Sequence, residues 1–386
     1  MEKEELKPDM RIGRSTAKKI FYIFLAVFLI LFILFLIYSL NSKTENYNSK
    51  NTASVLDIFT EQVEPKYKPL DKEDYDRRMN LLANNPIPKP IIKKVKDENG
   101  NITEVSEIPK THYIWPVSAP YPRDGAILPF NRIIAYYGNL YSKKMGILGE
   151  YNEDVVLEKL QNEVEAWTKA DPETPAIPAL HYIVTVAQGS PMKDNTYRAR
   201  MPESEVGKVL KMAEKINGIV FLDIQVGLSN VEKELPIIKK YLELPNVHLG
   251  LDPEFAMSKS GKKPGTVIGT MDASEINYAI DYLSNIVKDH DLPPKILMIH
   301  RFTQNMVTNS KNIKTTPETQ VVLNMDGWGG KAHKITTYKR FVYPEPIQFT
   351  GFKIFYKNDT KEKGTTVFTP AELLKLNPIP IYIQYQ

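Results

Sequence analysis

The fold is indicated most clearly by residues 247–255, VHLGLDPEF, an apolar run that ends in two carboxylates. Residues two apart in a β-strand point to the same side, so Asp252 and Glu254 are expected to share a face with Gly250. Pro253 has no N–H to donate to a sheet, and the strand should therefore end there. Two acids at the end of a buried strand are typical of the rim of an active site.

Similar apolar runs recur from residue 131 onward and alternate with stretches of helical spacing. In 153–169, for example, Val156, Leu160 and Val164 lie on one helical face. Alternating strands and helices imply right-handed βαβ units and a parallel sheet. The strands are predicted at eight places: 132–137, 179–187, 219–226, 247–252, 295–300, 320–325, 348–355 and 379–384.

Eight such units predict an α/β fold, a (β/α)8 barrel of the TIM type, over residues 131–386. A doubly wound open sheet is the alternative, but that fold usually carries a glycine-rich phosphate loop. The sequence contains no G-x-G-x-x-G or Walker pattern, which favours the barrel. No helix is predicted after the last strand. A β-hairpin and an irregular segment within 91–130 are therefore expected to cover the bottom or the open side of the barrel.

Residues 20–40, IFYIFLAVFLILFILFLIYSL, form an uncharged apolar run of the length that a bilayer requires, roughly 20 residues. The run is longer than the apolar part of a signal peptide, and no small-residue cleavage pattern follows it, which predicts an uncleaved transmembrane helix. Lys and Arg are concentrated in residues 1–19, so the positive-inside rule places this tail in the cytoplasm. We therefore expect a single-pass protein of the cell membrane whose C-terminal domain is extracytoplasmic.

The segment 41–90 is polar and weakly periodic, which predicts a stalk or linker with one short helix near 75–83. The stalk ends in PIPKP at 86–90, a stiff extended spacer. Two β-rich runs on either side of Asn99-Gly100 then predict the hairpin.

The composition excludes several classes of function. A net charge of only +4 argues against nucleic acid as a partner. The absence of cysteine excludes disulfides, thiolate metal sites and cysteine nucleophiles. No G-x-S-x-G pattern supports a serine nucleophile. The leading interpretation includes no cofactor and no metal.

In a parallel barrel, the side chains at the C-terminal ends of the strands converge on one mouth. Nearly every predicted strand begins apolar and ends polar, which indicates a pocket. When carboxyl groups share such a site, at least one of them has a raised pKa and can act as a general acid. Asp252 and Glu254 are the predicted catalytic residues. The predicted substrate-binding residues are Tyr137, Asn139, Gln188, Asp223, Gln225, His300, Asp326, Trp328, Lys353, Tyr356 and Gln384.

The ending Asp252-x-Glu254 resembles the D-x-E signature of barrel glycoside hydrolases, including chitinase-like enzymes and the muramidases that cut bacterial cell walls. The resemblance implies that Glu254 is the general acid on the glycosidic oxygen and Asp252 its helper, with Asp223 or Asp326 tuning them. The chitinase pattern has further acids upstream on the same strand, where this chain has His248 and Gly250. The segments YYGN at 136–139, LDPEFAM at 251–257 and GFKIFY at 351–356 also resemble a group of bacterial extracytoplasmic proteins of uncertain activity.

The sequence thus predicts a membrane-anchored, glycoside hydrolase-like protein whose partners are the membrane, a cell-wall or surface glycan and envelope proteins. One alternative is a catalytically silent barrel that serves as a scaffold or binding module. The other is a metal-dependent hydrolase, for which no compact H-x-H or H-E-x-x-H pattern exists. An open groove lined by Tyr137, Trp328 or Tyr356 would favour the hydrolase, whereas a mouth plugged by 259–267 would favour the scaffold. In the metal-dependent hydrolase, the ligands of the metal ion would come from His248, Asp252, Glu254, His300 and Asp326.

Overall fold

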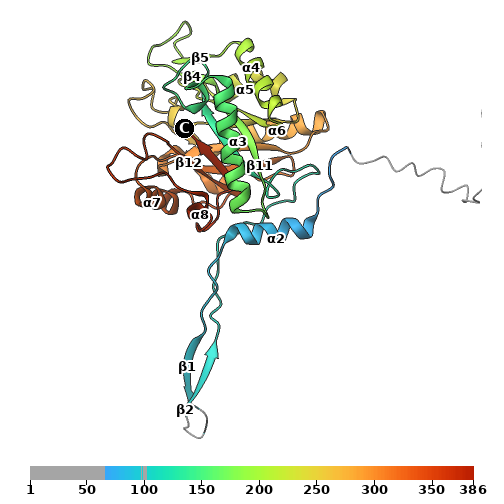
Figure 1. Cartoon of the computed structure of the whole chain (residues 1–386), viewed down its shortest axis with the longest axis vertical. Helices are drawn as coiled ribbons and strands as arrows, with labels where there is room; N and C mark the ends of the chain where they lie inside the picture. Colours follow the sequence, from blue (N-terminus) through green and yellow to red (C-terminus); the bar gives the residue numbers. More distant parts are fainter. Residues whose placement is uncertain (1–65, 97, 99–101) are drawn as a thin grey trace, which may run out of the picture. The chain divides into compact units, whose positions relative to one another are not determined.

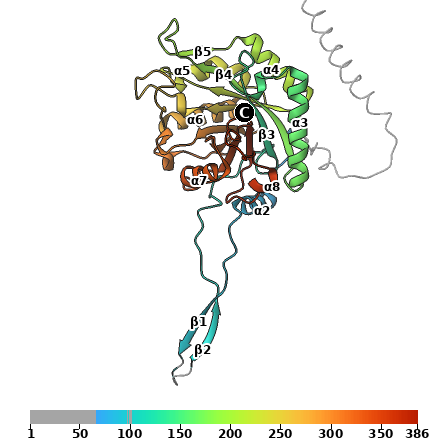
Figure 2. The same ribbon diagram turned by 60° about the vertical axis from the view of Figure 1, so that its left-hand side comes forward.

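The computed structural model describes residues 66–96, 98 and 102–386, and it contains a closed parallel barrel (Figure 2). Each barrel strand is hydrogen-bonded to the next, and the last strand pairs with the first, as a TIM-like fold requires. The predicted parallel barrel is confirmed. Its eight strands are β3 (Arg132–Gly138), β4 (Ala176–Ala187), β6 (Ile219–Ile224), β7 (Val247–Leu251), β9 (Lys295–Arg301), β11 (Thr319–Met325), β12 (Phe349–Ile354) and β13 (Tyr382–Tyr385).

Two short pairings add to the barrel strands. β5 (Arg198–Arg200) runs antiparallel to the end of β4, and β8 (Met271–Asp272) pairs in parallel with β10 (Val307–Thr308). The last barrel strand begins at Tyr382, later than the predicted 379. Pro378 and Pro380 just before it lack the N–H that a sheet ladder needs, which accounts for the difference.

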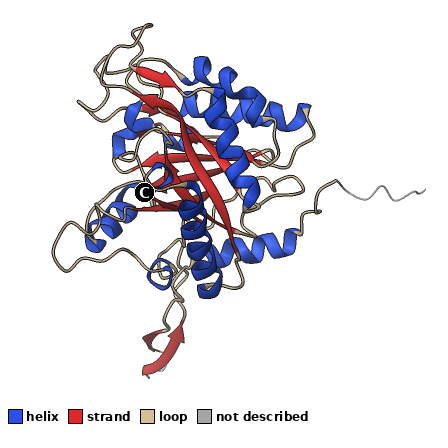
Figure 3. Cartoon of the chain, turned by 45° about the horizontal axis from the view of Figure 1, so that its top comes forward, coloured by secondary structure: helices blue, strands red, loops and turns tan. Residues whose placement is uncertain are grey.

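Helices lie outside the barrel strands, as Figures 1 and 3 show. Side-chain caps fix the beginnings of three of them: Asn152 and Asn230 each accept a backbone N–H of the first turn, and Asp272 forms a capping box with Glu275. The outer helices are α3 (Glu153–Ala170), α4 (Glu203–Lys215), α5 (Val231–Leu242), α6 (Ala273–Asp289), α7 (Lys331–Phe341) and α8 (Pro370–Leu373), and the 3-10 turns are η2 (Ile147–Gly149), η3 (Pro253–Phe255), η4 (Gln304–Met306) and η5 (Ser310–Asn312).

Successive side chains of each barrel strand point to opposite sides, so the strands bury two separate apolar layers. In β6, Val220 and Leu222 belong to the core between strands and helices, whereas Phe221 belongs to the core inside the barrel. Asp223 has the same parity as Phe221, so its carboxylate also points inward. The alternation therefore decides which polar strand ends can reach the barrel axis.

Helix α2 (Lys72–Ala83) packs against the N-terminal ends of the barrel strands. Its Tyr75, Met79 and Leu82 are buried in the same cluster as the barrel residues Phe349 and Ile381. Residues 66–83 belong to the same compact unit as the barrel, although they lie inside the segment 41–90 for which the sequence predicted a stalk. The described part of that segment up to α2 is thus part of the folded domain.

The predicted hairpin is present, but it covers nothing that the structure describes. β1 (Ile91–Lys96) and β2 (Ile102–Glu107) pair antiparallel, and every residue of both strands is exposed. The expectation that the hairpin closes the barrel is wrong, because neither of its faces packs against any other described residue. The irregular segment after it does cover the barrel: Leu128 is buried inside, and its C=O accepts a hydrogen bond from Gln320 Nε2 at 2.7 Å.

The predicted transmembrane helix at 20–40 and the cytoplasmic tail at 1–19 lie outside the described residues. Within the part of the chain that is described, no helix combines the length and apolarity needed to cross a bilayer.

Two adjacent isoleucines on α5 test the assignment of the core. Ile238 is 3% exposed and belongs to the layer between helices and strands, whereas Ile237 is 50% exposed. We expect Ile238→Ala to lower the free energy of unfolding by about 2–5 kcal/mol and Ile237→Ala to change it by less than about 0.5 kcal/mol. Urea unfolding of the two variants measures this difference. Equal losses in both would contradict the packing described here.

Candidate active site

A cavity of about 960 Å³ opens at the C-terminal ends of the barrel strands. Asp252 and Glu254 both line it, and no residue of 259–267 does, so that loop does not plug the mouth. Six of the predicted substrate-binding residues also line the cavity: Tyr137, Gln188, Gln225, Asp326, Trp328 and Lys353.

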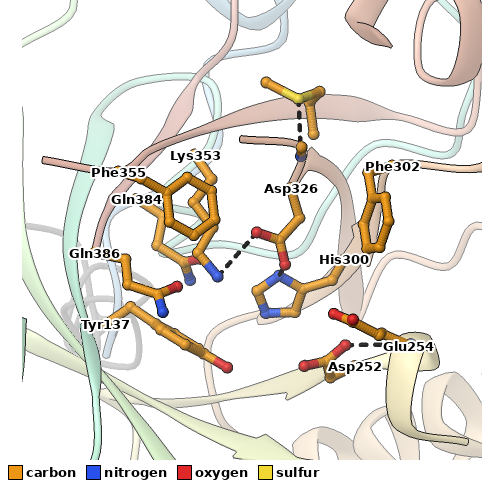
Figure 4. Close-up of polar contacts among 12 residues, drawn as sticks. Tyr137, Asp252, Glu254, His300, Phe302, Asp326, Lys353, Phe355, Gln384 and Gln386 are labelled. Carbon is orange, nitrogen blue, oxygen red and sulfur yellow. Dashed lines mark hydrogen bonds and ion pairs between the residues drawn. The ribbon is translucent and has the colours of Figure 1, made fainter. Parts of the chain in front are cut away.

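The two acids are brought together by a turn rather than by strand alternation. β7 ends at Leu251, one residue earlier than predicted, and Pro253–Phe255 form the short helix η3. Asp252 caps this turn, because its Oδ1 accepts the backbone N–H of Glu254 at 3.2 Å. Figure 4 shows the two carboxyl groups next to each other, facing His300 and Asp326.

Asp252 is the more deeply buried acid, at 2% exposed. Burial raises the pKa of its carboxyl to about 8, and the nearby charges of Asp223 and Glu254 add to the shift, while His300 opposes it. Its Oδ2 accepts a hydrogen bond from Gln225 Nε2 at 3.1 Å. At neutral pH this carboxyl therefore keeps its proton.

Glu254 is partly exposed to the cavity. Burial raises the pKa of its carboxyl, Asp326 raises it further, and Lys353 and His300 act in the opposite direction. A raised pKa favours the protonated form of a carboxyl group, and a carboxyl group that reaches an open cavity can transfer its proton to a bound molecule.

Asp326 is an acid of the site whose negative charge is balanced by two neighbouring side chains. Its Oδ1 lies 2.9 Å from Lys353 Nζ and its Oδ2 lies 2.8 Å from His300 Nδ1 (Figure 4). Burial alone would raise the pKa of this carboxyl, but Lys353 and His300 outweigh burial and lower it to about 2. The Lys353 ammonium also lies 3.9 Å from the centre of the Tyr137 ring, a cation–π contact.

A second polar layer lies beneath the cavity. His181, Asp223 and His300 are fully buried, and none of them lines the cavity. Tyr137 connects the layers, because its side chain lines the cavity while its hydroxyl donates to Asp223 Oδ2 at 3.2 Å. Asp223 and His300 were predicted at the rim, and the structure places them one layer deeper.

His181 was not predicted as a site residue. It has the parity of Ala179 and Ile183 in β4, and a lone imidazole on an otherwise apolar inward face was the signal in the sequence. One ligand atom from each of His181, Asp223 and His300 lies within 4.8 Å of the others, so these residues can hold a metal ion. Of the metal ligands considered from the sequence, only His300 belongs to this group. His248 instead accepts the backbone N–H of Ile296 at 3.1 Å.

Three other predicted residues are not brought to the cavity. Asn139 donates to the C=O of Ile183 at 2.9 Å and fixes a loop, and Gln384 is buried and donates to the Tyr382 hydroxyl at 3.0 Å. Tyr356 stacks on Tyr385 and donates to Glu163 of α3 at 2.7 Å, on the outer side of the barrel. Lining residues that the sequence did not predict include Phe302, Phe355, His333, Glu362 and Gln386.

No protein-family model matches this chain, and no curated protein is similar to it in sequence.

The protonation of Asp252 predicts a pH-dependent stability. The native state keeps the Asp252 proton up to about pH 8, whereas an unfolded chain releases it near pH ~3.9. Between these values the native state binds the extra proton, so the free energy of unfolding of the wild type falls as pH rises. Asp252→Asn has no such proton to lose. Its stability relative to the wild type should rise by roughly 2–5 kcal/mol between pH 4 and pH 8.

Urea unfolding at several pH values measures the effect, with the exposed Asp289→Asn as the control. The control should show no such trend. If the free energies of unfolding of Asp252→Asn and the wild type differ by the same amount at every pH in this range, Asp252 is ionised throughout.

Proposed function

We propose that the barrel is a glycoside hydrolase of an extracytoplasmic polysaccharide, with Glu254 as the general acid and Asp252 as its helper. The observation that carries the proposal is the position of Glu254: its carboxyl has a raised pKa, and it lines an open cavity directly beside a second acid. Hydrolysis of a glycosidic bond needs a proton donor of this kind at the leaving oxygen.

The proton that cleaves the glycosidic bond comes from Glu254 and is returned to it by water. Glu254 gives its proton to the glycosidic oxygen as the bond from that oxygen to the anomeric carbon breaks. Water adds to the anomeric carbon and gives up a proton, which returns to the Glu254 carboxylate. Asp252 lies next to Glu254, where it can orient the attacking water or a polar substituent of the sugar. Asp326, ion-paired with Lys353, supplies negative charge to the same cavity.

The walls of the cavity suit a saccharide. Tyr137, Phe302 and Phe355 line it (Figure 4), as does Trp328, and aromatic faces pack well against the apolar faces of sugar rings. Trp328 is 57% exposed on a rim loop rich in glycine, where no core packing explains it. A cavity of about 960 Å³ lies at the upper end of the usual range for ligand pockets, about 300–1,000 Å³.

The location of the substrate is proposed from the N-terminal segment. The apolar run at 20–40 and the basic residues before it support a membrane anchor that places the barrel outside the cytoplasm. Cell-wall or surface glycan is then the polysaccharide within reach, and envelope proteins are the neighbours.

Glu254→Gln tests the proposal directly. The amide cannot donate a carboxyl proton, so release of reducing ends should fall by about 10²–10⁴-fold. The assay uses the full chain in mild detergent with purified peptidoglycan and with other wall polysaccharides. The control is Glu362→Gln, because Glu362 lines the same cavity but lies exposed at its rim.

The control should retain wild-type activity. Equal activity of Glu254→Gln and the wild type would exclude Glu254 as the acid. Binding of a glycan by the wild type without release of reducing ends would instead identify a catalytically silent barrel.

Substitution of Trp328 tests whether the cavity wall binds sugar, separately from the proton transfer. Removal of one aromatic platform by Trp328→Ala should raise KM by about 3- to 10-fold and leave kcat within about 2-fold. Trp328→Tyr keeps a ring and should keep most of the affinity. If kcat falls and KM stays constant in Trp328→Ala, the ring acts on the reaction rather than on binding.

A further inference from the structure

Three buried polar atoms converge beneath the cavity without hydrogen-bond partners. They are the Nε2 atoms of His181 and His300 and the Oδ1 atom of Asp223. The Asp223 oxygen lies 3.4 Å from His181 Nε2 and 3.7 Å from His300 Nε2. All three residues are fully buried. Buried polar atoms are almost always paired, so a group of three unpaired atoms that face one another needs an explanation.

The separations are close to those of ligands around one tetrahedral ion: the Asp223 oxygen lies 3.4 and 3.7 Å from the two nitrogens, and all three ligand atoms lie within 4.8 Å of one another. Zinc binds imidazole nitrogen and carboxylate oxygen at about 2.0–2.2 Å, so neighbouring ligand atoms around it lie roughly 3.3–3.5 Å apart. Two imidazoles and one carboxylate favour zinc and similar transition metals, whereas calcium and magnesium prefer oxygen ligands alone.

The opposite atom of each side chain has a polar neighbour. His181 Nδ1 lies 2.7 Å from the Tyr382 hydroxyl, and His300 Nδ1 lies 2.8 Å from Asp326. The second oxygen of Asp223 accepts a hydrogen bond from Tyr137. Metal-binding histidines usually have such a partner on the other nitrogen, which fixes the ring and directs the free nitrogen to the ion.

Gly250 of β7 leaves room beside the same atoms. A Cβ at this position would lie 2.4 Å from Asp223 Oδ1 and 2.6 Å from His181 Nε2. Any other residue would therefore fill the space between the strand and the two ligand atoms. A glycine here explains how these atoms can surround an ion inside a packed barrel.

We propose that His181, Asp223 and His300 bind one divalent transition-metal ion of the zinc type beneath the cavity. This site goes beyond the glycoside hydrolase function, because its residues do not line the cavity and Glu254 is not among them. The ion would cross-link β4, β6 and β9 and neutralise the buried carboxylate.

Metal content tests the proposal without any activity assay. The full chain, purified in mild detergent without chelator, should contain about one zinc per chain by plasma mass spectrometry. After removal of the metal, titration with CoCl2 should give the intense visible absorption of a tetrahedral nitrogen–oxygen site and saturate at one ion per chain. Added ZnCl2 should raise the melting temperature of the stripped protein, since an ion that binds only the native state stabilises it.

Asp223→Asn should weaken zinc binding by at least ~10-fold, because the neutral amide is a poor ligand. His248→Gln is the matched control: His248 is also fully buried with an unpaired Nε2, but it lies outside the group. The control and Glu254→Gln should bind zinc as the wild type does.

The proposal is wrong if the wild type gives neither stoichiometric metal nor the cobalt spectrum. In that case His181 and His300 share the Asp223 carboxylate through long hydrogen bonds alone. Unchanged zinc affinity in Asp223→Asn, or an equal loss in His248→Gln, would also overturn it. The wild-type cobalt titration decides the question even if Asp223→Asn does not fold. Loss of hydrolysis in Glu254→Gln has no bearing on this result, so the two proposals fail separately.

Discussion

The parallel pairing of β13 with β3 closes the barrel, and this closure determines where every polar strand end lies. In an open sheet the first and last strands would lie at opposite edges. In the closed barrel, Tyr137 from the first strand touches Lys353 from the seventh, and Lys353 reaches Asp326 after the sixth. The cavity is thus produced by the whole ring of strands rather than by a single motif.

Closure also gathers carboxyl groups away from water, where they cannot all be ionised. Asp326 is compensated by Lys353 and His300, and Asp223 faces two histidines. Among the described residues, Asp252 and Glu254 have no ion-pair partner, and burial is the largest cause of the raised pKa of each. The site therefore separates two carboxyl groups whose pKa is raised from two whose pKa is lowered, which is the division that acid catalysis requires.

The barrel and its two central acids could be predicted from the sequence because both depend on local patterns, namely the alternation of strands with helices and a strand that ends in acids. How deep each side chain lies inside the barrel could not be predicted. Asp223 and His300 have the right parity, but their layer within the barrel depends on how neighbouring strands are staggered. Tyr356 is a different case. It lies three positions after Lys353, so strand alternation places the two side chains on opposite sides, and the Tyr356 side chain points outward. The exposed hairpin could not be placed either, because its packing partner is not encoded in its own residues.

The assignment of Glu254 as the general acid requires a glycosidic oxygen to bind beside its carboxyl group within the cavity. A crystal structure of the Glu254→Gln variant with a bound wall-derived oligosaccharide tests it most directly. We expect sugar rings against Trp328 and Phe355, with one glycosidic oxygen about 2.6–3.2 Å from the side chain at position 254. An oligosaccharide bound outside the cavity, or one whose glycosidic oxygens all lie beyond the reach of that side chain, would contradict it.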